Sequence, residues 1–156
     1  MIENHDYMED KLTILFGTMT GNAEDLATQV QERADETGLQ TEIKDLADYP
    51  AESLKEESEV AIVISTWGEG DPPDEAEDFC YAVLDQKVTG LNHLKYAIVA
   101  LGDSSYDDFC GCGRKLDEAL SAQGATRVID RVDLDIDFEE GFETWLEKYT
   151  EYLKAR

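Results

Sequence analysis

The chain has 156 residues, of which 37 are Asp or Glu and 13 are Lys or Arg, giving a formal net charge of −24 at pH 7. This length suits a single domain with its own core, and 42% hydrophobic residues exclude a disordered chain. The negative charge argues against nucleic acid and anionic membranes as partners, and no apolar run is long enough to span a bilayer. Three cysteines do not suggest a disulfide framework and favour a reducing, cytoplasmic setting.

Short apolar runs alternate with longer amphipathic stretches along the chain. Residues 1–10 are polar and aperiodic, so we predict a loose leader followed by one domain over 11–156. Continuous apolar runs predict buried strands at 12–16, 60–65 and 96–101, and weaker patterns predict edge strands at 41–46 and 126–129. Apolar residues at helical spacing predict helices across 23–34, 76–84, 116–120 and 138–153, with a single turn near Ser53 between the second and third strands.

This alternation of strands and helices predicts an α/β fold built as a three-layer sandwich. The sheet should be parallel and five-stranded, in the order 2-1-3-4-5, with helices on both faces. Ligands of such sheets bind outside the carboxyl ends of the strands, near the switch point between strands one and three. The loops that follow the first, third, fourth and fifth strands are therefore the candidates for a functional site.

The first of these loops, Gly17–Ala23, is rich in Thr, Gly and Asn and opens a helix. Hydroxyl groups and free backbone N–H groups at a helix N-terminus can bind a phosphate monoester. The loop lacks the lysine of a nucleoside-triphosphate loop, so magnesium-dependent triphosphate binding is not expected. The alternative is a helix start with ordinary turn residues, and the loop alone does not decide between the two.

Aromatic residues stand in the next two loops. Trp67 lies between the third strand and Gly68, where it is better placed to stack on a planar ligand than to pack in a core. Tyr106 lies in the polar loop after the fourth strand, at the same edge of the predicted sheet. Two aromatic side chains beside a phosphate site outline a slot for a flat ring with a phosphorylated tail. The alternative for Trp67 is a half-buried side chain in a rigid surface loop.

Four stretches together resemble the flavodoxin family: FGTMTGNAED, STWGEGDPPDEA, ALGDSSYDDFCGCG and DRVDLDID. They occur in the family's order and span nearly the whole chain from residue 11. The resemblance is to short-chain flavodoxins, and is greatest to the FMN domains of diflavin reductases such as the sulfite reductase flavoprotein and cytochrome P450 reductase. It implies a flavodoxin-like fold with FMN as cofactor. No metal site is expected, because Cys110 and Cys112 have no further ligands close in sequence.

The resemblance also implies a set of FMN-binding residues, in three loops and at one later position. These are Thr18, Met19, Thr20, Gly21, Asn22 and Ala23 around the phosphate; Ser65, Thr66, Trp67, Gly68, Glu69 and Gly70 along one side of the isoalloxazine; Leu101, Gly102, Asp103, Ser104, Ser105, Tyr106, Asp107, Asp108, Phe109 and Cys110 along the other; and Asp133 near the ring. Trp67 and Tyr106 would stack on opposite faces, and the carbonyl of Gly68 would turn to accept a hydrogen bond from N5 of the reduced flavin. Met19 and Trp67 depart from the residues common in relatives, so Met19 would contribute only its backbone.

Acidic residues are concentrated in the predicted ligand-facing loops. Segments 66–78, 101–113 and 133–143, which we call the acidic rim, hold 15 Asp or Glu and no Lys or Arg. A rim with only negative charges would steer basic partner proteins to the flavin edge. By charge repulsion it would also lower the reduction potential of the couple that forms the anionic reduced flavin. The alternative is general surface acidity that aids solubility, for example in a salty cytoplasm.

The sequence therefore predicts a monomeric electron carrier, not a stand-alone enzyme, that moves single electrons on FMN between a reductase and acceptor enzymes. The expected partners are basic-faced redox proteins, including an NADPH-dependent flavodoxin reductase. Two alternatives stay open: an accessory or regulatory flavodoxin-like protein that acts through partner binding, and an FMN domain excised from a diflavin reductase. A phosphate-accepting receiver domain is disfavoured, because Gly17–Thr18 and Thr66–Trp67 stand where it would need carboxylates.

Overall fold

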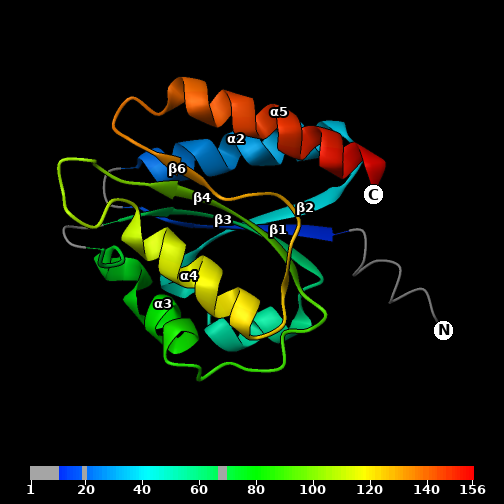
Figure 1. Cartoon of the computed structure of the whole chain (residues 1–156). Coiled ribbons are helices and arrows are strands. Elements are labelled where there is room, and N and C mark those ends of the chain that lie inside the picture. Colours follow the sequence, from blue (N-terminus) through cyan, green and yellow to red (C-terminus); the bar gives the residue numbers. More distant parts are fainter. Residues whose placement is uncertain (1–10, 19–20, 67–69) are drawn as a thin grey trace.

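The computed structural model describes residues 11–18, 21–66 and 70–156, and it has three layers, with a parallel sheet between two pairs of helices (Figure 1). The strands are β1 Lys11–Gly17, β2 Gln40–Asp45, β3 Glu59–Ser65, β4 Lys95–Leu101, β5 Thr126–Arg127 and β6 Val132–Leu134. The α-helices are α2 Asn22–Glu36, α3 Glu77–Leu84, α4 Gly111–Ala122 and α5 Glu139–Ala155, and the 3-10 helices are η1 Leu46–Asp48, η2 Ala51–Glu56 and η3 Asp74–Ala76.

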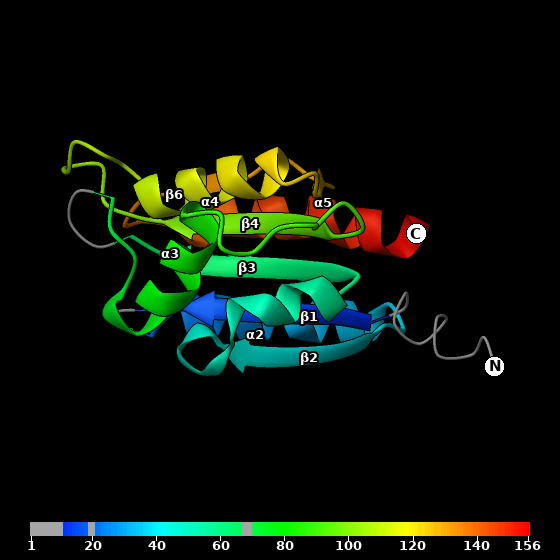
Figure 2. The same cartoon turned by 90° about the horizontal axis from the view of Figure 1, so that it is seen from below.

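The predicted parallel sheet and its strand order are confirmed. The order is β2-β1-β3-β4-β5, and every pairing is parallel. The register brings Gly17 beside Ile64 and Ser65 beside Leu101. The carboxyl ends of β1, β3 and β4 therefore meet at one edge of the sheet, opposite the end where the C-terminus lies (Figures 1 and 2).

Alternate residues of the central strands pack on opposite faces, as a sheet covered on both sides requires. Ile14 and Val63 belong to the core under α2 and α5, whereas Leu15 and Ile62 belong to the core under α3 and α4. The apolar stripe of α5, which includes Trp145, confirms the helix expected near the C-terminus. Among the described residues, no helix is long and apolar enough to cross a membrane.

The fifth strand differs from the prediction of one edge strand over 126–129. Only Thr126–Arg127 forms β5, the chain then leaves the ladder, and Val132–Leu134 returns as β6 to pair with the carboxyl half of β4. Arg127 and Arg131, on either side of this break, both donate to Asp117 of α4, and these ion pairs stabilise the interruption.

Smaller differences concern the ends of elements. The second strand ends at Asp45, because the Asp45 side chain accepts a hydrogen bond from the Ala47 N–H and starts η1 there. Two 3-10 helices, η1 and η2, replace the single turn expected near Ser53. Ala76 belongs to η3 rather than to the following α-helix, and Phe138 lies just before α5.

Candidate functional site

Helix α2 begins at the carboxyl edge of the sheet, shortly after the end of β1. Gly21 precedes the helix with φ +94°, a left-handed conformation that glycine adopts without strain, and no side chain of the described residues caps the helix. The Gly21 N–H donates to Thr18 Oγ1 at 2.8 Å, which closes the turn. Asn22 is exposed and Ala23 packs in the core, so Ala23 offers only its backbone here. Met19 and Thr20 lie outside the described residues.

Thr66 follows β3 and carries a hydroxyl that needs a partner. Its N–H donates to the Leu101 carbonyl at 2.9 Å, which fixes the loop start beside the end of β4. Its Oγ1 is buried, and none of the residues that the structure describes accepts or donates a hydrogen bond to it. A buried hydroxyl without a partner is costly, so among the described residues this hydroxyl is available to a polar group of a ligand. The predicted stacking of Trp67 and the predicted roles of Gly68 and Glu69 lie outside the described residues.

Gly70 and Asp108 bring the second and third loops together. Gly70 is buried with φ +99°, and a Cβ at this position would overlap the Asp108 carboxylate. Asp108 Oδ1 pairs with Arg114 at 2.8 Å, and Oδ2 lies 3.6 Å from Lys115 Nζ. The hydrogen bond from Arg114 lowers the pKa of Asp108. The two loops are thus in contact beside the start of α4.

Tyr106 lies exposed at the carboxyl edge of the sheet, with 46% of its surface accessible. Its N–H donates to the Asp103 carbonyl at 3.1 Å, and the Asp103 side chain accepts from the N–H and the hydroxyl of Ser105. The Ser104 N–H donates to Asp135 Oδ1 at 3.0 Å. The backbone of the loop is thereby held while the phenol ring remains available for stacking.

Cys110 ends this loop with its side chain turned away from solvent. It is fully buried, and its thiol lies 3.5 Å from the Ala100 carbonyl oxygen and 3.6 Å from that of Leu134. Burial raises the pKa of Cys110 to about 12. A ligand in this loop would therefore meet the backbone of Cys110 rather than its sulfur. Asp107 is exposed and Phe109 half-buried in the same loop.

Asp133 lies on β6 beside Ala100, next to the end of β4. Its carboxylate is paired with Arg131, whose pKa it raises, and Arg131 also pairs with Asp117. Arg131 and Asp117 are not among the predicted site residues, and Asp135 was predicted only as a member of the acidic rim. Asp117 stands between Leu116 and Leu120 in the apolar stripe of α4. A carboxylate in such a stripe is the sequence signal that could have identified Asp117 as a buried, paired residue.

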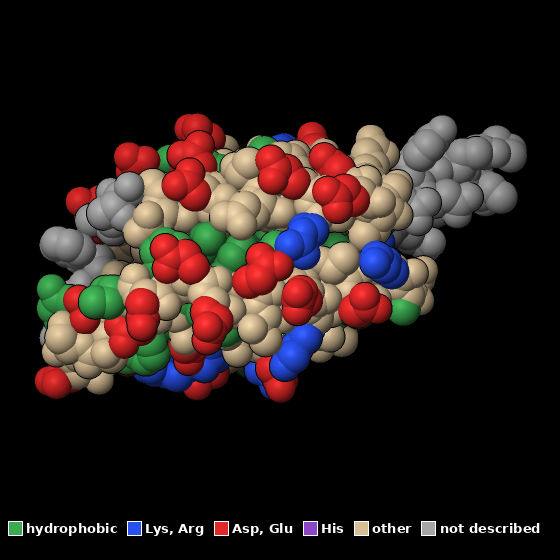
Figure 3. Space-filling view, turned by 90° about the horizontal axis from the view of Figure 1, so that it is seen from above, with side chains coloured by type: hydrophobic (Ala, Val, Ile, Leu, Met, Phe, Trp, Pro, Cys, Tyr) green, Lys and Arg blue, Asp and Glu red, His purple; other side chains and the backbone are tan. Residues whose placement is uncertain are grey.

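The acidic rim is less uniform in three dimensions than along the chain. Asp108, Asp133 and Glu143 are each paired with a cation from outside the three segments. Acidic side chains are also spread over the face formed by α2 and α5, where few Lys or Arg lie (Figure 3). Both the rim and the general surface therefore carry the negative charge.

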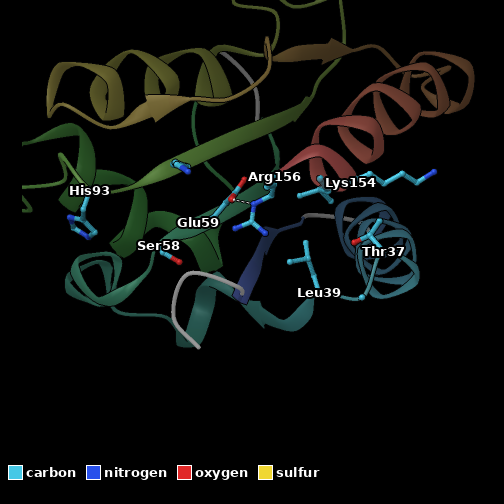
Figure 4. A pocket seen from close by; sticks show the side chains of 10 residues that line it. Thr37, Leu39, Ser58, Glu59, His93, Lys154 and Arg156 are labelled. Atoms are coloured by element: carbon cyan, nitrogen blue, oxygen red, sulfur yellow. Dashed lines mark ion pairs between the residues drawn. The ribbon is translucent and has the colours of Figure 1, made fainter. Parts of the chain in front are cut away.

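A separate hollow of about 740 Å³ lies at the opposite edge of the sheet, near the starts of β3 and β4 (Figure 4). Glu59, 1% exposed, pairs there with Arg156 across 2.9 Å, and burial raises the pKa of Glu59. Lys95 and Lys154 also line it. None of the predicted site residues lines this hollow.

Comparisons with known proteins identify the family. The family model described as flavodoxin matches residues 14–145. The sulfite reductase (NADPH) flavoprotein alpha-component of Vibrio parahaemolyticus is 42% identical over 135 residues, and that of Bacillus subtilis is 37% identical over 137 residues. These alignments cover 86% and 88% of this chain but only 22% and 23% of the relatives, so the chain spans about a quarter of their length.

Solved flavodoxin structures match over nearly their full length. A Streptococcus pneumoniae flavodoxin has a TM-score of 0.82 at 30% identity, covering 93% of this chain and 98% of that chain. Oxidised flavodoxin 1 from Bacillus cereus has a TM-score of 0.79 at 26% identity, covering 94% and 98%.

The chain belongs to the flavodoxin family, an electron-transfer family whose cofactor is FMN. The described part of the site fits that cofactor at three points. The N-terminus of α2, which no described side chain caps, suits a phosphate. The buried Thr66 hydroxyl has no partner among the described residues and can bind a polar group of the cofactor, and the exposed Tyr106 ring suits stacking.

Proposed function

We propose that this protein carries single electrons on bound FMN between a reductase and acceptor proteins. When bound, FMN supplies the one-electron redox chemistry, and the chain binds it, orients it and leaves an edge accessible to partners. The observation that carries the proposal is the meeting of three loops at one sheet edge, where the buried Thr66 hydroxyl has no partner among the residues that the structure describes.

Each loop has a separate part in this proposal. The N–H groups of the first turn of α2, with the Thr18–Gly21 turn before it, bind the phosphate. Thr66 donates to or accepts from a polar group of the cofactor. Tyr106 covers one face of the isoalloxazine, and Trp67 is assigned to the other face on the family resemblance.

The partners that we propose are redox proteins with basic faces, among them an NADPH-dependent reductase and its acceptor enzymes. The support is the net charge of −24 together with exposed members of the acidic rim, such as Asp71 and Asp74, that form no ion pair with any described Lys or Arg. Complementary charge raises the rate of encounter between such partners. We further propose a monomer in the cytoplasm, where its three free cysteines would stay reduced.

A second candidate is the FMN domain of a larger sulfite-reductase-type flavoprotein. The specific observation that favours it is the 42% identity to one quarter of such a protein, which exceeds the 30% identity to a solved flavodoxin. In this case the donor would be a flavin domain of the same polypeptide. The site and its residues would be the same.

The test is reconstitution of the full chain with FMN. We expect a yellow protein that releases one FMN per chain on denaturation, accepts electrons from a separately added NADPH-dependent flavodoxin reductase, and passes them to cytochrome c. A protein that binds FMN but is reduced only when fused to a reductase domain would favour the second candidate. A protein that stays colourless with excess FMN would contradict both and favour a role through partner binding alone.

A further inference from the structure

One guanidinium joins a buried carboxylate to an exposed one beside the site. Arg131 donates from Nε to Asp133 Oδ1 at 2.8 Å and from Nη2 to Asp133 Oδ2 at 3.3 Å. Its Nη1 donates to Asp117 Oδ2 at 2.8 Å. Asp117, 1% exposed, also accepts from Tyr96 Oη at 2.6 Å and from Arg127 Nη1 at 2.9 Å. The forked contact with Asp133 fixes both side chains in one geometry.

The segment that Arg131 holds also anchors the Tyr106 loop. The Gly102 N–H donates to the Leu134 carbonyl at 2.9 Å, and the Ser104 N–H donates to Asp135 Oδ1 at 3.0 Å. Leu134 and Asp135 directly follow Asp133 in the chain. The first residues of the loop after β4 are therefore attached to β6, and β6 is attached to α4 through Arg131.

We propose that Arg131 is a positioning residue for FMN. It holds β6 and the start of the 102–110 loop in place, and it offsets the charge of Asp133 at the edge where the flavin ring is assigned. A carboxylate without its cation would raise the free energy of the anionic reduced cofactor more than that of the oxidised form. This inference rests on the proposed function, and Arg127 provides an internal comparison because it pairs with Asp117 but not with Asp133.

The first test needs no cofactor. Amide hydrogen exchange is measured on the cofactor-free chain for wild type, Arg131→Gln and the matched control Arg127→Gln. We expect Gly102 and Ser104 to exchange about tenfold faster in Arg131→Gln, because local opening becomes easier, and to exchange as in wild type in Arg127→Gln. Equal exchange rates in all three proteins would overturn the positioning role.

The second test uses FMN itself, by measuring dissociation constants for its oxidised and fully reduced forms. We expect Arg131→Gln to raise the ratio of reduced to oxidised dissociation constants by about three- to tenfold. Arg131→Lys, which keeps the charge but loses the fork, should restore most of the ratio. Adding Asp133→Asn to Arg131→Gln should return the ratio to the wild-type value. An unchanged ratio in Arg131→Gln, or an equal change in Arg127→Gln, would overturn the charge role.

Asp133→Asn alone keeps the proposal testable if Arg131→Gln does not fold. It removes the charge while leaving the Asp117 contacts in place, so the ratio should fall below wild type and Gly102 should exchange faster. A wild-type ratio with wild-type exchange would overturn the proposal. Failure of the wild-type chain to bind FMN would instead contradict the proposed function, while the exchange comparison would still decide what Arg131 does.

Discussion

Gly70 and Asp108 are packed so closely that a Cβ on Gly70 would overlap the Asp108 carboxylate. This contact joins the loop after β3 to the loop after β4, and Arg114 holds the carboxylate in place from the first turn of α4. A second reason favours glycine at position 70: its φ of +99° lies in the left-handed region, which strains other residues. The two loops that are assigned to the flavin ring can therefore pack this closely only because residue 70 is a glycine and has no Cβ.

Gly70→Ala should destabilise the protein and weaken FMN binding. We expect a loss of about 1–3 kcal/mol in the free energy of unfolding from the strained φ and the overlap, with weaker FMN binding because the loops move apart. Gly38→Ala is the matched control, since Gly38 has φ +92° and open space around a Cβ. It should cost about 1 kcal/mol of stability and leave FMN affinity unchanged. Equal losses of FMN affinity in both variants would contradict the assignment.

Tyr106→Ala should weaken FMN binding by about 1–3 kcal/mol, as loss of an aromatic stacking partner does elsewhere. Fluorescence titration of the cofactor-free protein measures this directly. Tyr81→Ala is the control, because Tyr81 is similarly exposed at 41% but lies on α3. Trp67→Ala should have an effect like that of Tyr106→Ala. Unchanged affinity in both Trp67→Ala and Tyr106→Ala would show that the ring does not lie between them.

Electron transfer with a basic reductase should slow as salt rises. The rate should fall on the order of tenfold between 50 and 500 mM salt, because the Debye length shrinks below the separation of the approaching surfaces. Stopped-flow measurement of the second-order rate constant gives this dependence. A rate that does not change with salt would contradict electrostatic steering.

Two charge variants separate the rim from the general surface. Asp71→Asn, Asp74→Asn and Glu77→Gln combined remove three exposed rim charges, whereas Glu32→Gln, Glu36→Gln and Glu147→Gln combined remove three exposed charges of α2 and α5. Both triple variants have the same net charge. A smaller salt dependence in the rim variant alone supports steering by the rim, and equal reductions would assign the effect to overall acidity.

The Ser104–Asp135 contact should be lost in acid. Its hydrogen bonds with Ser104 lower the pKa of Asp135, so its stabilising effect is present above the unfolded pKa and disappears as pH falls through the folded pKa. Relative to its intrinsic rate, Ser104 amide exchange should therefore accelerate as pH falls below the usual pKa range of an aspartate carboxyl. In Asp135→Asn this acceleration should be absent, whereas the exposed neighbour variant Asp137→Asn should behave as wild type. The same acid response in Asp135→Asn would assign it to other groups.

The strands and helices, and through their alternation the sheet order, were predictable because the sequence signals of each element are local. The continuous apolar runs of β3 and β4, and the helical spacing of residues such as Phe142 and Tyr149, specify buried strands and covering helices without knowledge of distant contacts. The split of the fifth strand was not predictable in this way. It depends on Arg127 and Arg131 reaching a carboxylate 10 and 14 residues earlier in the chain.

The candidate site divides along the same line. Thr18, Gly21 and Tyr106 could be predicted as site residues from loop composition at predicted strand ends, because the residue types themselves indicate the chemistry. Pairings between loops, such as Ser104 with Asp135 across 31 positions, have no local signature. The acidic rim was predicted from charge counts, but the cations that neutralise part of it come from adjoining helices and turns, which a count within the loops leaves out.

The most direct test of the FMN site is an amide NMR titration of the cofactor-free full chain with FMN. The account predicts saturation at one FMN per chain, with the largest shifts at Gly21, Asn22, Thr66 and Gly102–Tyr106. No binding, or shifts confined to the hollow around Ser58, Glu59 and His93 at the opposite edge of the sheet, would contradict it.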